Sequence, residues 1–349
     1  MQDVPPRRLR SQLLAGNAAA TPHEAVSHLA AVQAQDYLGA LWAVGTRTRG
    51  AVESDVEEAL AQRKIVRCWP MRGTLHFVAA EDMRWMVELL APRVLKRHRP
   101  RLEREFGLDV RTLRRSRTLV ERALAGGQAL TRPELYAVLE QGRISTGSRR
   151  GLHILFTLAH EQVICFGARR GKQPAFVLLD EWLPAAKPKP RDEALGELAR
   201  RYFRGHAPAT VADFVWWSGL TTKEAKEGIA LGGVQLDGAP ARASRSSVHL
   251  LPPFDEYTVA YKDRSAILDP AFAKRVNAGG GMLNAIVVVN GFVAGTWKRA
   301  LGKSEVEVTV SLFRELKARE LRALEGEAER YGKFLGELPV IFTDGTHSA

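Results

Sequence analysis

The chain has 349 residues, 45% of them hydrophobic, which is enough to fill the cores of about two or three compact units. Lys and Arg number 51 against 39 Asp and Glu, a formal net charge of +12 at pH 7. This basic balance favours an anionic partner, nucleic acid first, although part of it is also explained by solvated Arg side chains.

The cysteines and the apolar residues indicate which kinds of site and which cellular compartment to expect. Cys68 and Cys165 form no disulfide framework, and no CxxC or HExxH spacing occurs, so we expect neither a metal nor a cofactor. The N-terminus carries no apolar run of signal-peptide length, and no stretch is apolar enough to span a membrane. We therefore expect a cytoplasmic protein.

The first predicted helix leads into a glutamine pair. Thr21-Pro22-His23-Glu24 is typical of a helix start, and apolar residues follow over 25–32. Gln33 and Gln35 come next; they would face different sides of a regular helix but more nearly the same side in an extended or broken turn. Two amides can hold and orient a water but cannot deprotonate it, which suits only a reaction with a good leaving group. The alternative is a solvated helix end, closed by Asp36.

Three segments show the order of a winged helix, in which helices are followed by a β-hairpin. Each has a helix-start signal or a short helix, then apolar runs of strand length. The first segment has a helix over 53–62 and strands over 65–69 and 73–78, across Pro70-Met71-Arg72. The second has helices over 134–140 and 150–162 and strands over 163–167 and 175–179, around the basic loop 168–172. The third has helices over 210–217 and 221–230, joined by Ser218-Gly219-Leu220, then a strand from Val234 with a turn at Asp237-Gly238.

The segments between and after these units differ in character. Residues 93–117 are Arg-rich and form either a helix that lies on phosphate or a solvated helix face. Residues 184–190 are a Pro/Lys connector. In the tail, Asn290-Gly291 between apolar runs over 283–289 and 292–298 predicts a hairpin, followed by a strand over 306–310 and a helix over 312–331.

These elements predict an α+β fold of three tandem winged-helix units, with a C-terminal β-rich extension and helix. The expected domains are 1–117 with the glutamine pair, 118–190, and 191–349 with the hairpin extension and the last helix.

The chain resembles the AlkZ/YcaQ group of DNA glycosylases, within a broad family of winged-helix DNA-binding proteins. The resemblance covers nearly the whole chain, through motifs that occur in the same order. The motifs are Val32-Gln33-Ala34-Gln35-Asp36, Trp69-Pro70-Met71-Arg72-Gly73-Thr74-Leu75-His76, Tyr202-Phe203-Arg204-Gly205-His206-Ala207-Pro208-Ala209-Thr210, Asp213-Phe214-Val215-Trp216-Trp217-Ser218-Gly219-Leu220, Leu251-Pro252-Pro253-Phe254-Asp255-Glu256-Tyr257 and Gly291-Phe292-Val293-Ala294-Gly295-Thr296-Trp297-Lys298.

The resemblance implies that the three winged helices form a concave basic surface, in a bacterial, nucleoid-associated protein. It also implies a catalytic Gln-apolar-Gln motif at the bottom of that surface, which Gln33-Ala34-Gln35 matches. One branch of the family has Asp where Gln35 stands, so this chain is more similar to the AlkZ branch, which is associated with self-resistance to DNA-alkylating natural products. The family acts on guanine alkylated at N7, including adducts that cross-link the two strands. The implied activity is that of a DNA repair hydrolase that cleaves the N-glycosidic bond of N7-alkylguanine.

Alkylation at N7 gives guanine a positive charge, so the base leaves as a neutral molecule. Gln33 and Gln35 would orient the attacking water and ease the charge on the sugar. No lysine is placed as a Schiff-base nucleophile, so we expect a monofunctional glycosylase. Asp36 and His76 are candidates for electrostatic support, the latter with Thr74 and Arg72 on a strand, and both have ordinary structural alternatives.

Other residues receive simpler interpretations. Trp216-Trp217 is interpreted as core, and Asp255-Glu256 as structural, since adjacent strand residues face opposite ways. The expected partner is duplex DNA that contains alkylated guanine, bound by a monomer. The alternatives are a non-catalytic winged-helix regulator and a protein-interaction scaffold. The candidate DNA-binding residues are Arg72, Arg149, Arg150, Arg169, Arg170, Lys172, Lys298 and Arg299.

Overall fold

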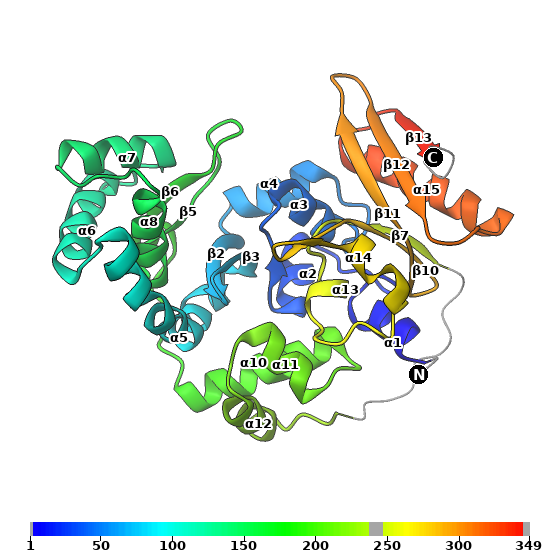
Figure 1. The fold of residues 1–349 in the computed structure, drawn as a ribbon, viewed down its shortest axis with the longest axis horizontal. Coiled ribbons are helices and arrows are strands. Elements are labelled where there is room, and N and C mark those ends of the chain that lie inside the picture. The colour runs from blue at the N-terminus through cyan, green and yellow to red at the C-terminus, as the bar shows by residue number, and fades with distance from the viewer. Residues whose placement is uncertain (1–2, 237–246, 345–349) are drawn as a thin grey trace. The chain divides into compact units, whose positions relative to one another are not determined.

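The computed structural model describes residues 3–236 and 247–344 (Figure 1). Their contacts form two compact units. The larger unit combines Met1–Glu58 with Gly196–Ala349, and the smaller unit is Ala59–Leu195. Helices and strands are mixed throughout, which confirms the predicted α+β class. The division into three domains at residues 117 and 190, and the concave basic surface, stay predictions.

A winged-helix motif fills the second half of the smaller unit. Its helices surround a three-stranded sheet in the order β4-β6-β5, and both predicted helices and both predicted strands are present. Leu124, Leu135, Leu139 and Leu158 from the helices share one buried core with the strands. The elements are α6 (Val110–Leu124), β4 (Leu130–Thr131), α7 (Arg132–Gln141), α8 (Arg150–His160), β5 (Ile164–Phe166) and β6 (Ala175–Leu178).

The first half of the smaller unit carries an antiparallel hairpin of β2 (Ile65–Met71) and β3 (Thr74–Ala79). The predicted strands are confirmed, but the predicted turn is wrong. Pro70 and Met71 still belong to β2, and the chain reverses at Arg72 and Gly73, which have φ values of 55° and 80°. Two consecutive residues with positive φ form the tight turn that matches the twist of a hairpin.

The Arg-rich segment 93–117 is two helices rather than one. Helix α5 (Ala80–Phe106) ends because Gly107 takes the left-handed conformation, with φ 57°. Helix α6 then begins after Asp109, whose carboxylate accepts a hydrogen bond from the Thr112 N–H at 2.7 Å. The connector 184–190 has neither helix nor strand, as predicted.

The larger unit begins with the helices that precede the β2–β3 hairpin in the chain. They are α1 (Val4–Ser11), α2 (Pro22–Leu29), α3 (Tyr37–Gly45) and α4 (Glu53–Ala61), with the short strand β1 (Val32–Gln33) between α2 and α3. The order α2, β1, α3, α4, β2, β3 is the chain order of a winged helix.

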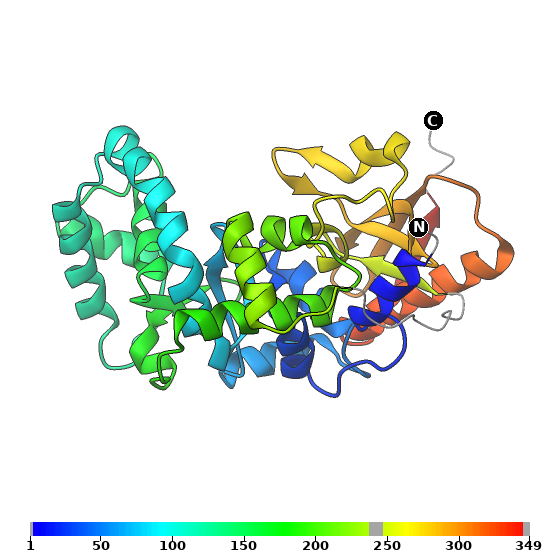
Figure 2. The same cartoon turned by 90° about the horizontal axis from the view of Figure 1, so that it is seen from below.

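The third predicted unit is only partly right. Helices α10 (Arg191–His206), α11 (Val211–Ser218) and α12 (Thr222–Leu231) form one cluster in both ribbon views (Figures 1 and 2). Gly219 turns the chain between α11 and α12 with φ 74°. The predicted strand at Val234 is wrong, because Val234 and Gln235 lie in no strand. The turn at Asp237-Gly238 lies outside the described residues.

The next strand after α12, β7 (Val248–Leu251), belongs instead to a five-stranded sheet in the order β13-β12-β11-β10-β7. The hairpin predicted at Asn290-Gly291 is confirmed, since both residues have positive φ and β10 pairs with β11 around them. The C-terminal helix starts six residues later than predicted, at Ala318 rather than Leu312, because Leu312 ends β12. The elements are β10 (Ile286–Val289), β11 (Phe292–Leu301), β12 (Val306–Leu312), α15 (Ala318–Phe334) and β13 (Val340–Asp344).

Threonine caps begin several of these helices. Thr131 with Glu134 and Thr221 with Glu224 form capping boxes, and Thr210 with Asp213 forms the same arrangement with a shorter acid. Within the described ranges, no helix is long and apolar enough to cross a membrane. The remaining short elements are α9 (Leu179–Trp182), α13 (Glu256–Val259), η1 (Pro270–Phe272), α14 (Ala273–Val276), β8 (Asn277–Gly279) and β9 (Met282–Leu283).

Candidate active site

The glutamine pair lies on extended backbone between two helices. Helix α2 ends at Leu29, earlier than predicted, because Ala30 has φ 65° and cannot continue a right-handed helix. Gln33 is the last residue of β1, and Gln35 lies in the bend before α3. Gln33 is only 7% exposed, whereas Gln35 is exposed. The pair therefore takes the extended alternative, with one amide inside the larger unit and one that solvent reaches.

A buried carboxylate fixes the main chain of Gln33. The N–H of Gln33 donates to Oε1 of Glu256 at 2.9 Å, across 223 residues of sequence. The second oxygen, Oε2, accepts a hydrogen bond from Nε1 of Trp217 at 2.9 Å. Glu256 has no exposed surface. This contact was missed in the sequence, where Asp255 and Glu256 were assigned to a strand.

Asp255 and Glu256 instead begin the short helix α13. Asp255 is the N-cap, and its Oδ1 accepts from the Tyr257 N–H at 2.8 Å. Both carboxylate oxygens of Asp255 also accept from Arg47, at 2.7 and 2.8 Å, and neither side chain is exposed. A bidentate pair of this kind fixes the geometry as well as the charge. Asp255 is structural, as interpreted, but for a reason other than strand alternation.

Asp36 opens α3 rather than closing α2. Its Oδ1 accepts from the Gly39 N–H at 3.3 Å, which makes it the N-cap of α3. Its Oδ2 lies 3.8 Å from Nη2 of Arg299, whose guanidinium also donates to the hydroxyl of Tyr331. Asp36 thus caps α3 directly beside Gln35. Arg299 is its cationic neighbour, at a distance close to the longest that an ion pair allows.

His76 lies in the smaller unit, in contact with two of the residues expected beside it. Its Nδ1 is 3.0 Å from the carbonyl oxygen of Thr74, so Nδ1 carries the proton, and its Nε2 is 3.4 Å from Nη2 of Arg72. The ring is fully buried. A neutral His76 can accept from Arg72 and thereby hold that side chain at the hairpin turn. Its support of the glutamines stays a prediction.

The two tryptophans of α11 differ. Trp217 is fully buried, and its ring lies 5.0 Å from that of Tyr202, so the core interpretation is confirmed. Trp216 is 46% exposed and is not core, although its Nε1 donates to the carbonyl of Val259 at 3.1 Å.

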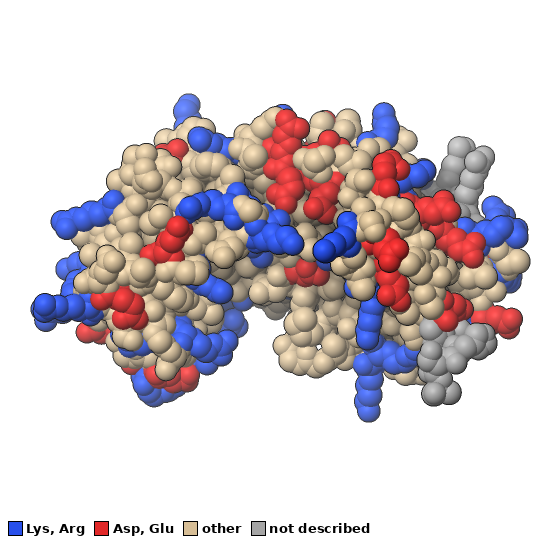
Figure 3. Space-filling model, turned by 90° about the horizontal axis from the view of Figure 1, so that it is seen from above, with Lys and Arg blue, Asp and Glu red and all other residues tan. Residues whose placement is uncertain are grey.

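The predicted DNA-binding residues lie in four parts of the chain, of which the first is Arg72 at the β2–β3 turn. Arg169, Arg170 and Lys172 lie in the β5–β6 loop, where Nη1 of Arg170 forms an ion pair with Glu134 at 2.7 Å and Lys172 is exposed. Arg149 caps the start of α8, and Nε of Arg150 donates to the Ser145 carbonyl at 3.0 Å. Lys298 is exposed on β11. On the face drawn in Figure 3, basic and acidic side chains are interspersed.

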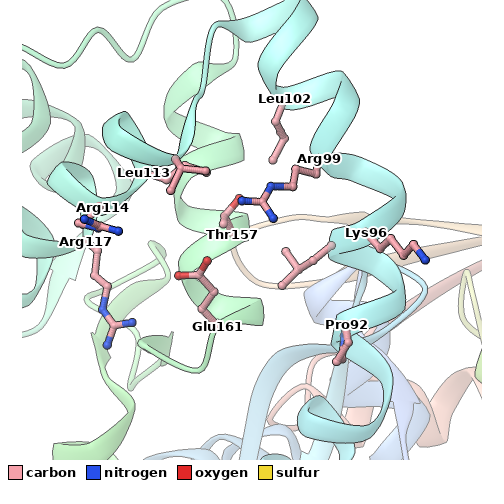
Figure 4. A pocket seen from close by; sticks show the side chains of 11 residues that line it. Pro92, Lys96, Arg99, Leu102, Leu113, Arg114, Arg117, Thr157 and Glu161 are labelled. Atoms are coloured by element: carbon pink, nitrogen blue, oxygen red, sulfur yellow. The ribbon is translucent and has the colours of Figure 1, made fainter.

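A pocket of about 470 Å³ lies between α5, α6 and α8 of the smaller unit (Figure 4). Aliphatic side chains and four cations line it, and Glu161 faces into it. Desolvation raises the pKa of the Glu161 carboxyl, against the opposing effect of Arg117 and Arg99. Two of the arginines are already paired along their own helices, Arg99 with Glu103 and Arg117 with Glu121. The lining residues are Pro92, Leu95, Lys96, Arg99, Leu102, Val110, Leu113, Arg114, Arg117, Thr157 and Glu161.

Both cysteines are buried free thiols, and burial raises the pKa of each. Among the residues that the structure covers, no group of three or more His, Cys, Asp or Glu is arranged to hold a metal ion.

The chain is similar to known proteins in both sequence and structure. The family model described as "DNA glycosylase AlkZ-like" matches residues 26–334. A protein named "Interstrand DNA cross-link repair glycosylase" from Streptomyces sahachiroi is 26% identical, over 95% of this chain and 96% of its own length. The solved structure of Streptomyces sahachiroi DNA glycosylase AlkZ superposes with a TM-score of 0.79 at 24% identity, over 98% of this chain and 99% of that one.

Proposed function

Because the chain belongs to the AlkZ-like family of DNA glycosylases, we propose that it excises guanine alkylated at N7 from duplex DNA and leaves an abasic site. The observation that carries the proposal is the extended Gln33-Ala34-Gln35 segment, anchored at Gln33 by Glu256 and exposed at Gln35. It presents the neutral amide of Gln35 to solvent, two residues from the buried amide of Gln33.

The proposed reaction needs little acid or base. The bond from the sugar C1′ to N9 breaks, its electron pair goes to the cationic base, and the base leaves neutral. A water attacks C1′ and then releases its proton to solvent. The amide oxygens of Gln33 and Gln35 orient that water by accepting its hydrogen bonds and ease the positive charge that develops on the sugar.

Neutral amides also limit the substrate. Without a strong general base or a proton donor for the leaving base, undamaged guanine stays inert. We extend the proposal to bulky monoadducts and interstrand cross-links, and the name of the Streptomyces relative supports the cross-links. A cross-linked base resists full extrusion from the duplex, so such a substrate needs an open site. DNA repair or self-resistance to an alkylating natural product is the role that fits this chemistry.

The direct test is incubation of the pure protein with duplex DNA that contains a single N7-methylguanine, followed by alkaline cleavage at abasic sites. Strand cleavage after alkali, but not before it, is expected of a monofunctional enzyme. Tight binding with no release of base would instead support the non-catalytic regulator.

A further inference from the structure

Glu256 uses both carboxylate oxygens inside the larger unit. Oε1 accepts the Gln33 N–H at 2.9 Å and Oε2 accepts the Trp217 Nε1–H at 2.9 Å. Oε2 also lies 3.4 Å from Nε2 of His206, and neither side chain of that pair has exposed surface. A buried carboxylate is costly unless it is bonded and balanced, so each of these contacts matters.

His206 is a second polar neighbour of the carboxylate. Nδ1 of His206 lies 3.0 Å from the carbonyl oxygen of Tyr202. A carbonyl can only accept, so Nδ1 carries a hydrogen and donates it. This bond orients the ring and keeps Nε2 on the side of Glu256, 3.4 Å from Oε2.

Rigid neighbours hold this pair in place. The His206 ring stacks on Tyr202, with centroids 4.8 Å apart and an interplanar angle of 15°. The main-chain oxygen of Glu256 accepts from Nε2 of Gln12 at 3.1 Å. The residue before it, Asp255, is fixed by Arg47. The carboxylate therefore reaches Gln33 from a fixed position.

We propose that Glu256 is the positioning residue of the glutamine motif and that His206, 3.4 Å from its Oε2, helps to hold the carboxylate in place. The proposal rests on the function proposed above. Glu256 touches no reacting atom; it fixes the main chain of Gln33 and so the direction of the first amide. Loosening this contact displaces the water without removing any group that binds DNA.

Glu256→Gln tests the proposal with almost no change of shape. The new amide oxygen still accepts from Gln33, but the new NH₂ meets the Trp217 N–H, donor against donor. We expect single-turnover base release to fall by roughly 10- to 100-fold, as for a small misplacement of reacting groups, while the DNA dissociation constant changes by less than about twofold. Adding Trp217→Phe removes the opposing N–H and should restore part of the rate.

A matched control lies in α15. Glu327 is also a buried carboxylate of the larger unit, and its partner is Arg330, at 2.9 Å, on the same helix. Glu327→Gln should release base at the wild-type rate. Hydrogen–deuterium exchange supplies a second readout, since the Gln33 amide should exchange faster in Glu256→Gln than in Glu327→Gln.

Each possible outcome supports or overturns either the positioning role of Glu256 or the proposed function. A folded Glu256→Gln protein with the wild-type rate overturns the proposal, and so does an equal loss of rate and DNA affinity. If Glu256→Gln fails to fold, His206→Gln takes its place, with the same loss of rate at constant affinity expected and an unchanged rate contradicting the proposal. If the wild type releases no base, the proposed function fails, and unchanged exchange at Gln33 in Glu256→Gln would then overturn the positioning role separately.

Discussion

Arg47 donates two hydrogen bonds to Asp255, at 2.7 and 2.8 Å, from a position where neither side chain is exposed. The same guanidinium donates to the main-chain and side-chain oxygens of Gln12, both at 3.0 Å. One arginine thus joins α3, the end of α1 and the start of α13, next to the carboxylate that holds Gln33. Breaking this pair tests how far the site depends on its buried charges.

Asp255→Asn should destabilise the protein strongly, because it leaves the Arg47 charge buried without its counter-ion. We expect a loss of about 3–5 kcal/mol in the free energy of unfolding, measured by urea denaturation. Thr21→Ala, which removes the exposed N-cap of α2 in the same unit, is the comparison and should cost about 1 kcal/mol. Equal effects of the two variants would mean that the Arg47–Asp255 pair has no special weight.

Asp36→Asn should cost less activity than Gln35→Ala. Asparagine caps a helix as well as aspartate does, so the start of α3 should survive while the charge is lost. Electrostatic assistance by Asp36 is worth about 1–2 kcal/mol, so we expect base release to slow by roughly five- to thirtyfold. The measurement is single-turnover excision at saturating enzyme and matched pH. An inactive Asp36→Asn beside a nearly normal Gln35→Ala would make Asp36 the general base.

Duplex binding should depend on salt and show little sequence preference, because phosphate contacts release counterions. Lys172→Ala removes an exposed cation from the β5–β6 loop and should lower the slope of log affinity against log salt by about one. Arg170→Ala should change the slope less, since Glu134 already balances that charge. A single tightly bound palindromic site, or affinity independent of salt, would favour a different class of protein.

Acid should destabilise the fold through two buried histidines. Burial lowers the pKa of His160 to about 4 and that of His249 to about 3, from 6.5. Both rings are neutral in the folded protein, whereas the unfolded chain protonates them below pH 6.5. Their contribution is therefore fully present above pH 6.5 and is lost as pH falls towards 4. At pH 5 each histidine should cost about 2 kcal/mol relative to pH 7.

Unfolding midpoints at pH 7 and pH 5 give this difference, with His160→Gln and His249→Gln as variants that lack the titrating ring. The variants should lose less stability than the wild type over the same interval. An identical loss in all three proteins would place the acid sensitivity elsewhere.

Local signals predicted local structure well. The threonine caps, the Asn290-Gly291 hairpin and the helices of α7, α8, α11 and α12 depend on neighbours within a few residues, and all are present. The errors arose where distant segments decide. Val234 reads as a strand residue, yet β7 pairs with β10 instead of forming a wing. β13 pairs in parallel with β12, which no short-range pattern indicates.

The site divides in the same way. Gln33 and Gln35 could be selected as candidate catalytic residues because two neutral amides at a chain bend can orient a water for a reaction with a good leaving group. The contact of Glu256 with Gln33 could not, because it joins segments 223 residues apart. Asp255 and Glu256 lie between Phe254 and Tyr257 in the sequence. Two acids among apolar and aromatic residues indicate buried charge, and this was the one sequence signal for the contact of Glu256 with Gln33.

In the proposed reaction, Gln33 and Gln35 promote release of alkylated guanine without holding the DNA. Wild type, Gln33→Ala and Gln35→Ala are therefore compared on a duplex with one N7-methylguanine, with base release and DNA affinity measured on the same preparations. We expect release by the wild type and at least a roughly hundredfold slower release by each variant, at nearly unchanged affinity. Release at the wild-type rate by both variants, or loss of affinity in parallel with activity, would contradict it.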